Sequence, residues 1–572
     1  MIVIDKDLMV PTADGVRLAT DVFRLQDGPP SPVLLVRTPY GKDQMTIGGS
    51  ESFDILRAVQ AGYVAVAQDV RGRYGSEGEF EPNVNETRDG VDMIAWAAGQ
   101  PWSSGVVGTF GGSYLGGTQW LPARQNPPAL KAMAPAVTFS DMHEGCSYQG
   151  GANVLHSLRW VVEDIAPAEF RRRAAQNPTA APPADVELDL YITLNELPLG
   201  SNPLIGDAAP FYLERLAHPT PGDYWLAISP NSGYEQITAP ALNIGGWYDL
   251  FQWGTLQNFQ NMRRRGGGQL ARAQQRVIIG PWTHTDFSGS FSDRDFGPTS
   301  SAAAIDLPGV QLRWFDRWLR GTENGIDSEP PVMIFVMGID QWRTETDWPL
   351  PDTQYRPYYM HSAGAANSLR GDGSLTTSPP ADEPSDVYLF NPLRPVPSVG
   401  GQLLLPGASS MGPRDQREVE VRDDVLVYST PVLEQPIEVT GPIELRLWAS
   451  SSAPDTDFTG KLVDVHPDGR AIILTDGILR ARYRNSLNAP EPMEPSTPYE
   501  LSLNLWATAN VFLPGHRIRL EVASSNFPKF DRNSNTGGDI TSETADQYQP
   551  AVNRILHDKD HPSRLILPII ER

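Results

Sequence analysis

The sequence predicts an α/β fold in which a parallel-sheet core is interrupted by a helical insertion and followed by a β-rich domain. Short apolar runs of strand length alternate with helical patterns at 1–140 and again at 237–348. Between them, at 141–236, strand-like runs are missing and helix-compatible stretches alternate with proline-rich breaks. From 349 to 572 the pattern is that of many short strands. We therefore expect three domains with these boundaries.

The core strands are predicted from apolar runs of the length typical of strands buried on both faces. They lie at 32–37, 63–68, 239–245 and 275–280. A helical pattern at 87–98 follows the first pair, and aromatic residues at 310–319 predict a helix that packs on the sheet. Alternating strands and helices favour a mostly parallel sheet with helices on both faces.

The segment 349–572 is predicted to form an antiparallel sandwich or jelly roll. Apolar and charged residues alternate strictly at 443–447, which is the period of a strand and not of a helix. Turn sequences recur at 423–424, 467–469 and 514–515. Many short strands separated by turns are typical of such all-β domains.

The charge and the cysteine content of the chain exclude several classes of binding partner and cofactor. The formal net charge is −23, so an acidic surface repels phosphates and anionic headgroups, and we expect neither nucleic acid nor a membrane as partner. The single cysteine, Cys146, has no intrachain disulfide partner, and no Cys/His cluster has zinc spacing, so no metal or cofactor is expected. The first residues lack a secretory pattern and no run approaches 18 apolar residues, which predicts a cytoplasmic protein.

Residues 106–117 have the pattern of a nucleophile elbow. An apolar strand-like run leads into a glycine pair, then Ser113, then residues able to begin a helix. Such a turn needs small neighbours, lifts the hydroxyl out of the sheet and offers helix amides to an oxyanion. Leu115 departs from the G-x-S-x-G motif, whose second glycine comes one place later as Gly116. Because glycine-rich turns also serve packing alone, the serine requires partners.

A catalytic serine needs a base and an orienting acid, and on this fold both follow later strands in the order Ser, acid, His. Of the nine histidines, only His284 closely follows a predicted buried strand, and Asp249 follows the preceding one. Asp286 lies too near His284 to come from another strand, and Asp69 precedes the serine. The sequence thus predicts a serine hydrolase that uses Ser113, Asp249 and His284.

Eight short motifs run along nearly the whole chain. They are R-T-P-Y at 37–40, Q-D-V-R-G at 68–72, F-G-G-S-Y-L-G at 110–116, G-W-Y-D at 246–249, G-P-W-T-H at 280–284, F-V-M-G-I-D at 335–340, D-T-D-F-T at 455–459 and S-S-N-F-P-K at 524–529. Together they resemble the bacterial cocaine-esterase family, related to X-prolyl dipeptidyl peptidases and α-amino-acid ester hydrolases. The resemblance implies an α/β-hydrolase core with a helical insertion, a C-terminal jelly roll and association into dimers.

The same resemblance implies roles for individual residues. Ser113 is the expected nucleophile, His284 the general base and then acid, and Asp249 the orienting carboxylate. The oxyanion hole is expected to use the backbone N–H of Tyr114 and the hydroxyl of Tyr40, since a phenol donates one directed hydrogen bond. Asp69 and Arg71 are expected to form a structural network beneath the site.

The acyl pocket implied by the resemblance is aromatic and apolar. Its expected residues are Trp160, Phe251, Leu404 and Leu405, the last two on a jelly-roll loop that closes over the site. Ser147 stands near the position of a family pocket tryptophan, which predicts a wider or differently shaped pocket.

We expect the substrate to be a small-molecule carboxylic ester with an aromatic, benzoyl-like acyl group. Relatives that select a substrate ammonium place carboxylates just after the triad aspartate, whereas residues 250–253 here are L-F-Q-W. Two alternatives stay open: an acylase, amidase or α-amino-acid ester hydrolase acting on β-lactam-type side chains, and a non-catalytic protein that binds ligands through its jelly roll.

Overall fold

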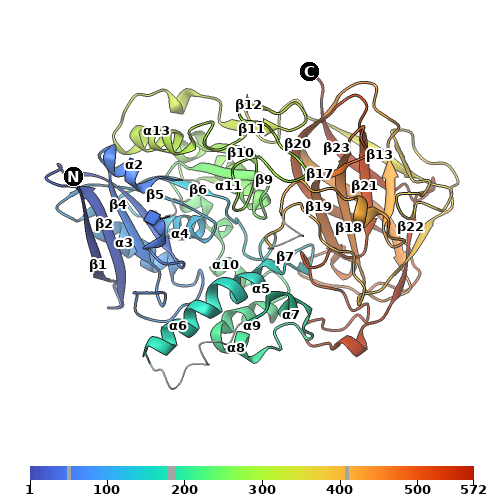
Figure 1. Ribbon diagram of the computed structural model, residues 1–572, viewed down its shortest axis with the longest axis horizontal. Helices are drawn as coiled ribbons and strands as arrows, with labels where there is room; N and C mark the ends of the chain where they lie inside the picture. The colour runs from blue at the N-terminus through green and yellow to red at the C-terminus, as the bar shows by residue number, and fades with distance from the viewer. Residues whose placement is uncertain (48–52, 177–187, 406–410) are drawn as a thin grey trace.

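The computed structural model describes residues 1–47, 53–176, 188–405 and 411–572. An α/β module and a C-terminal β module lie side by side, and a group of helices lies at the bottom of the view beneath their junction (Figure 1). The two modules share one large hydrophobic cluster, which includes Trp247 and Phe259 of the first and Leu445 and Leu505 of the second.

The α/β module is built on a ten-stranded sheet. In spatial order its strands are β1 (Ile2–Pro11), β2 (Arg17–Leu25), β4 (Val64–Asp69), β3 (Ser31–Thr38), β5 (Ser103–Gly112), β6 (Leu130–Ala136), β9 (Leu242–Tyr248), β10 (Arg276–Thr283), β11 (Val332–Val336) and β12 (Gln341–Glu345). All neighbouring pairs from β4 to β11 are parallel, and the outer pairs are antiparallel. The predicted strands at 32–37, 63–68, 239–245 and 275–280 are confirmed, each with shifted ends.

The register of the parallel strands brings their carboxyl ends to one edge. Strands β9 and β10 pair Leu242 with Arg276 and Gly246 with Gly280, and almost every residue of both strands is buried. Residues that directly follow these strands therefore emerge beside one another.

Helices cover both faces of this sheet. They are α1 (Gln44–Ile47), α2 (Ile55–Gln60), α3 (Glu86–Ala98), α4 (Tyr114–Ala123), α11 (Gln252–Arg265), α12 (Gln269–Ala273) and α13 (Leu307–Leu319). Helices α2 and α13 pack with Leu34 of β3, whereas α3 and α4 pack with its neighbour Leu35, whose side chain points to the opposite face. Helix α13 begins before the predicted 310, because Asp306 caps it by accepting a hydrogen bond from the N–H of Gly309 at 3.3 Å.

The segment between β6 and β9 is mainly helical. It contains a small hairpin of β7 (Tyr148–Gln149) and β8 (Ala152–Asn153), helices α5 (His156–Trp160), α6 (Ala166–Gln176), α7 (Leu190–Asn195), α8 (Pro203–Ala208), α9 (Pro210–Leu216) and α10 (Asp223–Ala227), a π-helical turn (Val161–Ile165) and two 3₁₀ turns (Pro230–Ser232, Tyr234–Gln236). The hairpin was not predicted, since its strands are only two residues long. A cluster centred on Leu155, Leu158 and Tyr212 holds the helices together and includes Leu403 and Leu405 of the β module.

The C-terminal module contains an eleven-stranded sheet. Its strands run β15 (Asp386–Phe390), β22 (Ala551–Leu556), β17 (Ile437–Ser451), β23 (Arg564–Ile570), β13 (Gln354–His361), β14 (Ser374–Thr376), β16 (Leu426–Ser429), β21 (Arg517–Ala523), β18 (Asp457–Val465) and β19 (Ala471–Arg480), and β20 (Tyr499–Phe512) pairs with β17. The described residues also form a short helix α14 (Arg417–Glu420), 3₁₀ turns at Ala481–Tyr483 and Ala545–Gln547, and a 3₁₀ turn at Ile326–Ser328 before β11. In β17 the side chains of Ile443, Leu445 and Leu447 are buried, which confirms the predicted strand alternation.

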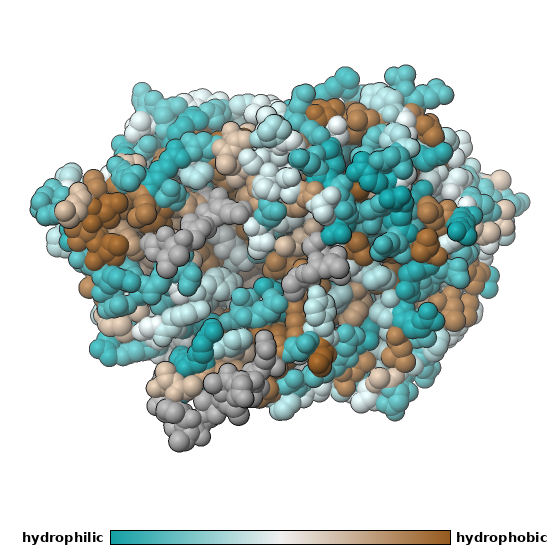
Figure 2. Space-filling model, viewed as in Figure 1, coloured by the Kyte–Doolittle hydropathy of each residue, from teal (hydrophilic) through white to brown (hydrophobic). Residues whose placement is uncertain are grey.

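The visible surface is mixed, with hydrophobic side chains gathered at the left end of Figure 2, where β1 lies in Figure 1. The exposed apolar residues there are Ile4, Leu8 and Met9, and Met1 precedes the strand. Across the described ranges, every helix is too short or too polar to span a bilayer.

Candidate active site

Ser113 sits at the turn from β5 into α4 with φ 59° and ψ −125°. This backbone conformation is unfavourable for any residue other than glycine, so surrounding contacts must hold the serine in it. The N–H of Ser113 donates to Ala136 O at 2.9 Å, and Thr138 Oγ1 donates to Ser113 O at 2.7 Å. The turn has the strand-to-helix geometry predicted for a nucleophile elbow and is held by hydrogen bonds to β6 and to the segment after it.

The irregular motif around the serine follows from two close approaches. A Cβ atom on Gly116 would lie 2.5 Å from Cβ of Thr138, so this position must be glycine for α4 to approach the segment after β6. Leu115 instead faces Gly111, where an added Cβ would lie 2.7 Å from Cβ of Leu115. A bulky residue is therefore accommodated at 115, and the small residue is needed one place later.

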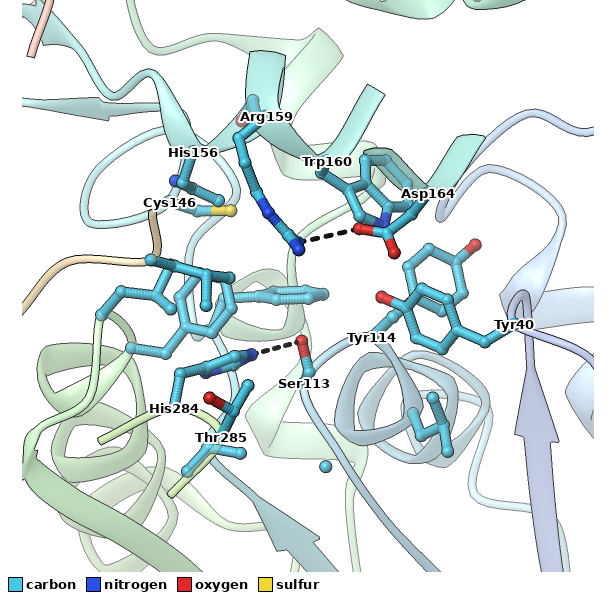
Figure 3. Close-up of a pocket in the computed structure, with 18 of the residues that line it drawn as sticks. Tyr40, Ser113, Tyr114, Cys146, His156, Arg159, Trp160, Asp164, His284 and Thr285 are labelled. Atoms are coloured by element: carbon cyan, nitrogen blue, oxygen red, sulfur yellow. Dashed lines mark hydrogen bonds and ion pairs between the residues drawn. The ribbon is translucent and has the colours of Figure 1, made fainter. Parts of the chain in front are cut away.

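Ser113, His284 and Asp249 form a continuous hydrogen-bonded relay. Oγ of Ser113 lies 3.0 Å from Nε2 of His284, the contact dashed in Figure 3, and Nδ1 of His284 lies 2.7 Å from Oδ1 of Asp249. Asp249 is completely buried, and within the described part of the chain its Oδ2 has no hydrogen-bond partner. The arrangement allows imidazole to take the serine proton while the carboxylate stabilises the resulting charge.

Strand ends position the two partners of the serine. His284 directly follows β10 and Asp249 directly follows β9, so both come from the edge at which β5 ends. The ring of Phe251 stands edge-on to His284, with centroids 5.4 Å apart and planes at 78°. This contact restricts rotation of the imidazole and adds an apolar wall beside it.

Two tyrosines flank the serine in different ways. The hydroxyl of Tyr114 donates to Glu86 Oε1 at 2.9 Å and accepts from the N–H of Asn83 at 3.1 Å, so its side chain is engaged beneath the site. Its backbone N–H is at the first position of α4, where no intrahelical acceptor exists. Tyr40 lines the cavity, and Figure 3 shows its hydroxyl turned toward Ser113.

The Tyr40 phenol stays protonated because burial raises its pKa, and the nearby Asp164 raises it further. The loop that carries it is anchored on both sides. Asp69 Oδ1 accepts from the N–H of Lys42 at 2.6 Å, and Arg73 Nε donates to Pro39 O at 3.0 Å. A fixed, protonated phenol is suited to donate a hydrogen bond into the site.

Asp69 and Arg71 lie outside the cavity, but they belong to two separate sets of contacts and not to the one network that the sequence predicts. Burial raises the pKa of Asp69 to about 6, although the backbone N–H groups of Lys42 and Gly75 bond to it. Arg71 is paired separately, with Nη2 2.6 Å from Asp89 Oδ1. The two residues thus support different loops and form no pair with each other.

A cavity of about 460 Å³ opens above Ser113. Of the predicted acyl-pocket residues, Trp160, Phe251 and Leu404 line it. Leu405 is corrected: it is absent from the lining and packs into the helical cluster around Leu155, because its backbone turns the side chain toward those helices. Ser147 is buried behind the lining.

Several charged or titratable residues of the cavity escaped the sequence analysis. Arg159, Asp164, Arg215 and His156 all come from the helical segment, and Figure 3 shows the first two joined across the cavity roof opposite Ser113. Arg159 Nη1 lies 2.8 Å from Asp164 Oδ2. No motif marks these residues, and the sequence indicates only that the segment that carries them is helical.

One further cluster has the residue types of a metal site. Ligand atoms of Asp464, His466 and His516 lie within 4.8 Å of one another in a second cavity between the modules. His516 Nδ1 is already hydrogen-bonded to Asp464 Oδ1 at 2.8 Å, and Arg294 and Arg470 line the same cavity. These contacts account for the cluster as a polar network, and we assign no ion to it.

Family profiles match both modules. Residues 14–286 match the X-Pro dipeptidyl-peptidase (S15 family), and residues 324–566 match the X-Pro dipeptidyl-peptidase C-terminal non-catalytic domain. The fold is accordingly that of a two-domain S15 protein, with an N-terminal catalytic domain and a C-terminal domain without catalytic function.

Individual proteins are similar over the full length. The cocaine esterase of Rhodococcus sp. (strain MB1 Bresler) is 44% identical, covering 99% of this chain and 98% of that protein. An aminopeptidase from a marine sediment archaeon (Thaumarchaeota archaeon) has a TM-score of 0.84 at 26% identity, and an α-amino acid ester hydrolase has 0.82 at 25%. Both alignments cover 100% of this chain and 97% of the other.

Proposed function

Because the chain belongs to the cocaine-esterase family of S15-type serine hydrolases, we propose that it cleaves carboxylic esters through an acyl-enzyme on Ser113. The chain is a serine carboxylic-ester hydrolase on the strength of that kinship. The observation that carries the assignment of the site is the relay, 3.0 Å from Ser113 Oγ to His284 and 2.7 Å from His284 to Asp249.

The proposed reaction has two steps of acyl transfer. Ser113 attacks the ester carbonyl while His284 takes its proton, and His284 then protonates the leaving alcohol. Water, activated by the same imidazole, hydrolyses the acyl-enzyme. The oxyanion of each tetrahedral intermediate accepts hydrogen bonds from the Tyr114 N–H and the Tyr40 hydroxyl, each such donor contributing about 3 kcal/mol.

We place the acyl group among Trp160, Phe251 and Leu404. These side chains line a cavity of about 460 Å³, and the Trp160 ring stacks on Tyr114 with centroids 6.0 Å apart. Flat aromatic walls close to the nucleophile suit a benzoyl-like acyl group, whose ring packs against them.

The second candidate, an amidase or α-amino-acid ester hydrolase, is supported by similarity to the solved structures of an aminopeptidase and of an α-amino acid ester hydrolase. It requires a free carboxylate to hold the substrate ammonium. Among the described residues of the lining, Asp164 supplies the carboxylate. It is already paired with Arg159, whose Nη1 lies 2.8 Å from Asp164 Oδ2. The described cavity therefore supports a neutral or anionic acyl group better than a cationic one.

Two measurements test the proposal. A fluorophosphonate probe is expected to label Ser113 in the native protein and to leave Ser113→Ala unmodified; absence of labelling would support the non-catalytic, ligand-binding alternative. A panel of benzoyl esters, glutaryl amides and phenylglycyl amides is expected to show preference for the esters. Preference for amides with a free amine would overturn the choice of substrate.

We further propose that 141–236 is a cap inserted into an α/β-hydrolase core of 1–140 and 237–348, and that 349–572 is a jelly roll. Helices α5 to α10 between β6 and β9, and the eleven-stranded sheet after the core, support these domains. A homodimer in the cytoplasm acting on small-molecule esters remains a prediction of the sequence.

A further inference from the structure

Arg215, on helix α9, lines the active-site cavity and is only 5% exposed. Its guanidinium contacts the face of Phe211, with Cζ 5.2 Å from the ring centroid, and the phenol of Tyr224. In the described ranges no carboxylate forms an ion pair with it, and its buried Nε has no hydrogen-bond partner. It is a buried cation that lacks a counter-charge.

Three other buried arginines of the described residues each have carboxylate or carbonyl partners, although one nitrogen of Arg37, Nη2, has no hydrogen-bond partner. Arg37 is paired with Glu86, and Arg480 is paired with two aspartates. Arg73, which has no carboxylate partner among the described residues, donates to the backbone carbonyls of Pro39, Asp164 and Ile165. Leaving a buried charge uncompensated costs several kcal/mol of folding stability, so a contribution to stability does not explain why Arg215 is buried here.

Asp141 and Glu144, acidic residues of the same segment, form no ion pair with Arg215 and hydrogen-bond to other groups. Asp141 accepts hydrogen bonds from the N–H of His143 and from Asn231, and Glu144 accepts from the N–H of Gly150. The other guanidinium in the cavity lining, that of Arg159, is paired with Asp164. The cavity therefore carries one positive charge in excess on its helical side.

Contacts place this charge near the proposed acyl side of the cavity. Phe211, which lies under the guanidinium, has its ring centroid 5.7 Å from that of Trp160. His156, whose electrostatic neighbours include Arg215 and His284, stands edge-on to Phe251 at 5.5 Å. Burial and these charges lower the pKa of His156 to about 3, so it is neutral and adds no second cation.

We propose that Arg215 binds a carboxylate on the acyl part of the substrate, so that half-esters of dicarboxylic acids are preferred over neutral esters. The inference rests on the proposed ester hydrolysis at Ser113. A guanidinium offers parallel N–H donors that match a carboxylate, and a carboxylate would supply the counter-charge that the protein lacks. Hydrolysis consumes one water, breaks the ester C–O bond and releases an alcohol and the dicarboxylate; the carboxylate on Arg215 takes no part in bond making.

The test compares three esters of similar size. 4-Nitrophenyl butyrate is neutral, mono-4-nitrophenyl glutarate carries a carboxylate on the acyl side, and the butyryl ester of 4-hydroxybenzoate carries it on the alcohol side. The wild-type protein is expected to have its highest kcat/KM with the glutarate ester. In Arg215→Met the ratio of kcat/KM for glutarate over butyrate is expected to fall about 10- to 100-fold, and Arg215→Lys to fall less.

The matched control is Arg264→Met, which removes an exposed arginine from α11 and is expected to leave the ratio unchanged. Thermal unfolding separates binding from a structural role. Removing an unpaired buried charge is expected to keep or raise the Tm, and free glutarate is expected to raise the Tm of the wild-type protein but not of Arg215→Met.

Three results would overturn the inference. They are an equal loss on all three esters with a lower Tm, an effect confined to the alcohol-side carboxylate, and a wild-type preference for the neutral ester that Arg215→Met does not alter. Failure of the proposed function is distinguishable from these, because in that case the wild-type protein hydrolyses none of the esters and the fluorophosphonate probe leaves Ser113 unlabelled.

Discussion

Nδ1 of His284 lies 2.7 Å from Oδ1 of the fully buried Asp249, and this single contact fixes which way the imidazole faces. With Nδ1 donating to the carboxylate, Nε2 is left as the acceptor for the Ser113 hydroxyl at 3.0 Å. In the proposed mechanism, Asp249 therefore sets the imidazole tautomer that general-base catalysis needs.

Replacing Asp249 with asparagine is expected to lower kcat for ester hydrolysis about 10³- to 10⁴-fold, because an amide favours the wrong imidazole tautomer. Steady-state kinetics with 4-nitrophenyl butyrate measures the change. The control is Asp286→Asn, which alters the acid nearest to His284 in sequence and is expected to retain activity. Comparable losses in both variants would contradict the assignment of Asp249.

The Tyr40 hydroxyl is expected to act on the transition state and not on substrate binding. Tyr40→Phe should lower kcat about 10²- to 10³-fold with little change in KM, since it removes one oxyanion donor. The fluorophosphonate probe should still label Ser113, at a lower rate. A rise in KM at constant kcat would instead assign Tyr40 to substrate binding.

Gly116 is expected to be essential for the elbow. A Cβ there would lie 2.5 Å from Cβ of Thr138, so Gly116→Ala should destabilise the fold by about 1–3 kcal/mol and reduce labelling of Ser113. Chemical denaturation measures the stability. At Gly268 an added Cβ meets nothing within 4 Å and φ is −171°, so Gly268→Ala serves as the control and should have almost wild-type stability.

The raised pKa of Asp69 leads us to expect that the stability of the fold depends on pH. Its folded-state pKa is raised to about 6 from a usual 3.8, so between these values the folded protein binds more protons than the unfolded chain. Stability should therefore fall as the pH rises from about 4 to 6, by about 2–3 kcal/mol from this group.

Asp69→Asn should remove that contribution. As the pH rises from about 4 to 6, the wild-type protein should therefore lose unfolding free energy relative to the variant. Urea denaturation at several pH values provides the measurement. Asp27→Asn is the control, because Asp27 is exposed and asparagine tolerates its φ of 56°. A parallel pH profile for Asp69→Asn and wild type would refute the prediction.

The buried strands and the relay could be predicted from the sequence because each depends on a short, local pattern of residues. Buried parallel strands are continuous apolar runs, and their carboxyl ends share one edge, so Asp249 and His284 were found as residues that follow such runs. The two-residue strands of the hairpin at 148–153 carry too little periodicity to be recognised.

The residues that line the pocket could be predicted from the sequence only in part. Phe251 lies beside the relay in sequence and lines the cavity, but Leu404 and Leu405 were indistinguishable as neighbours on one loop. Which of the two side chains faces the cavity depends on the packing of Leu405 against helices more than 180 residues away in the chain, for example at Tyr212.

The sequence by itself predicted the buried core strands, the glycines of the elbow and the three members of the relay, since these follow from periodicity and from fixed positions at strand ends. Only the tertiary structure decided which residues of 141–236 enter the site. Helices of five to eleven residues define their buried faces but not their partners, and docking of α5 and α9 over Ser113 is what brings Arg159 and Arg215 into one cavity.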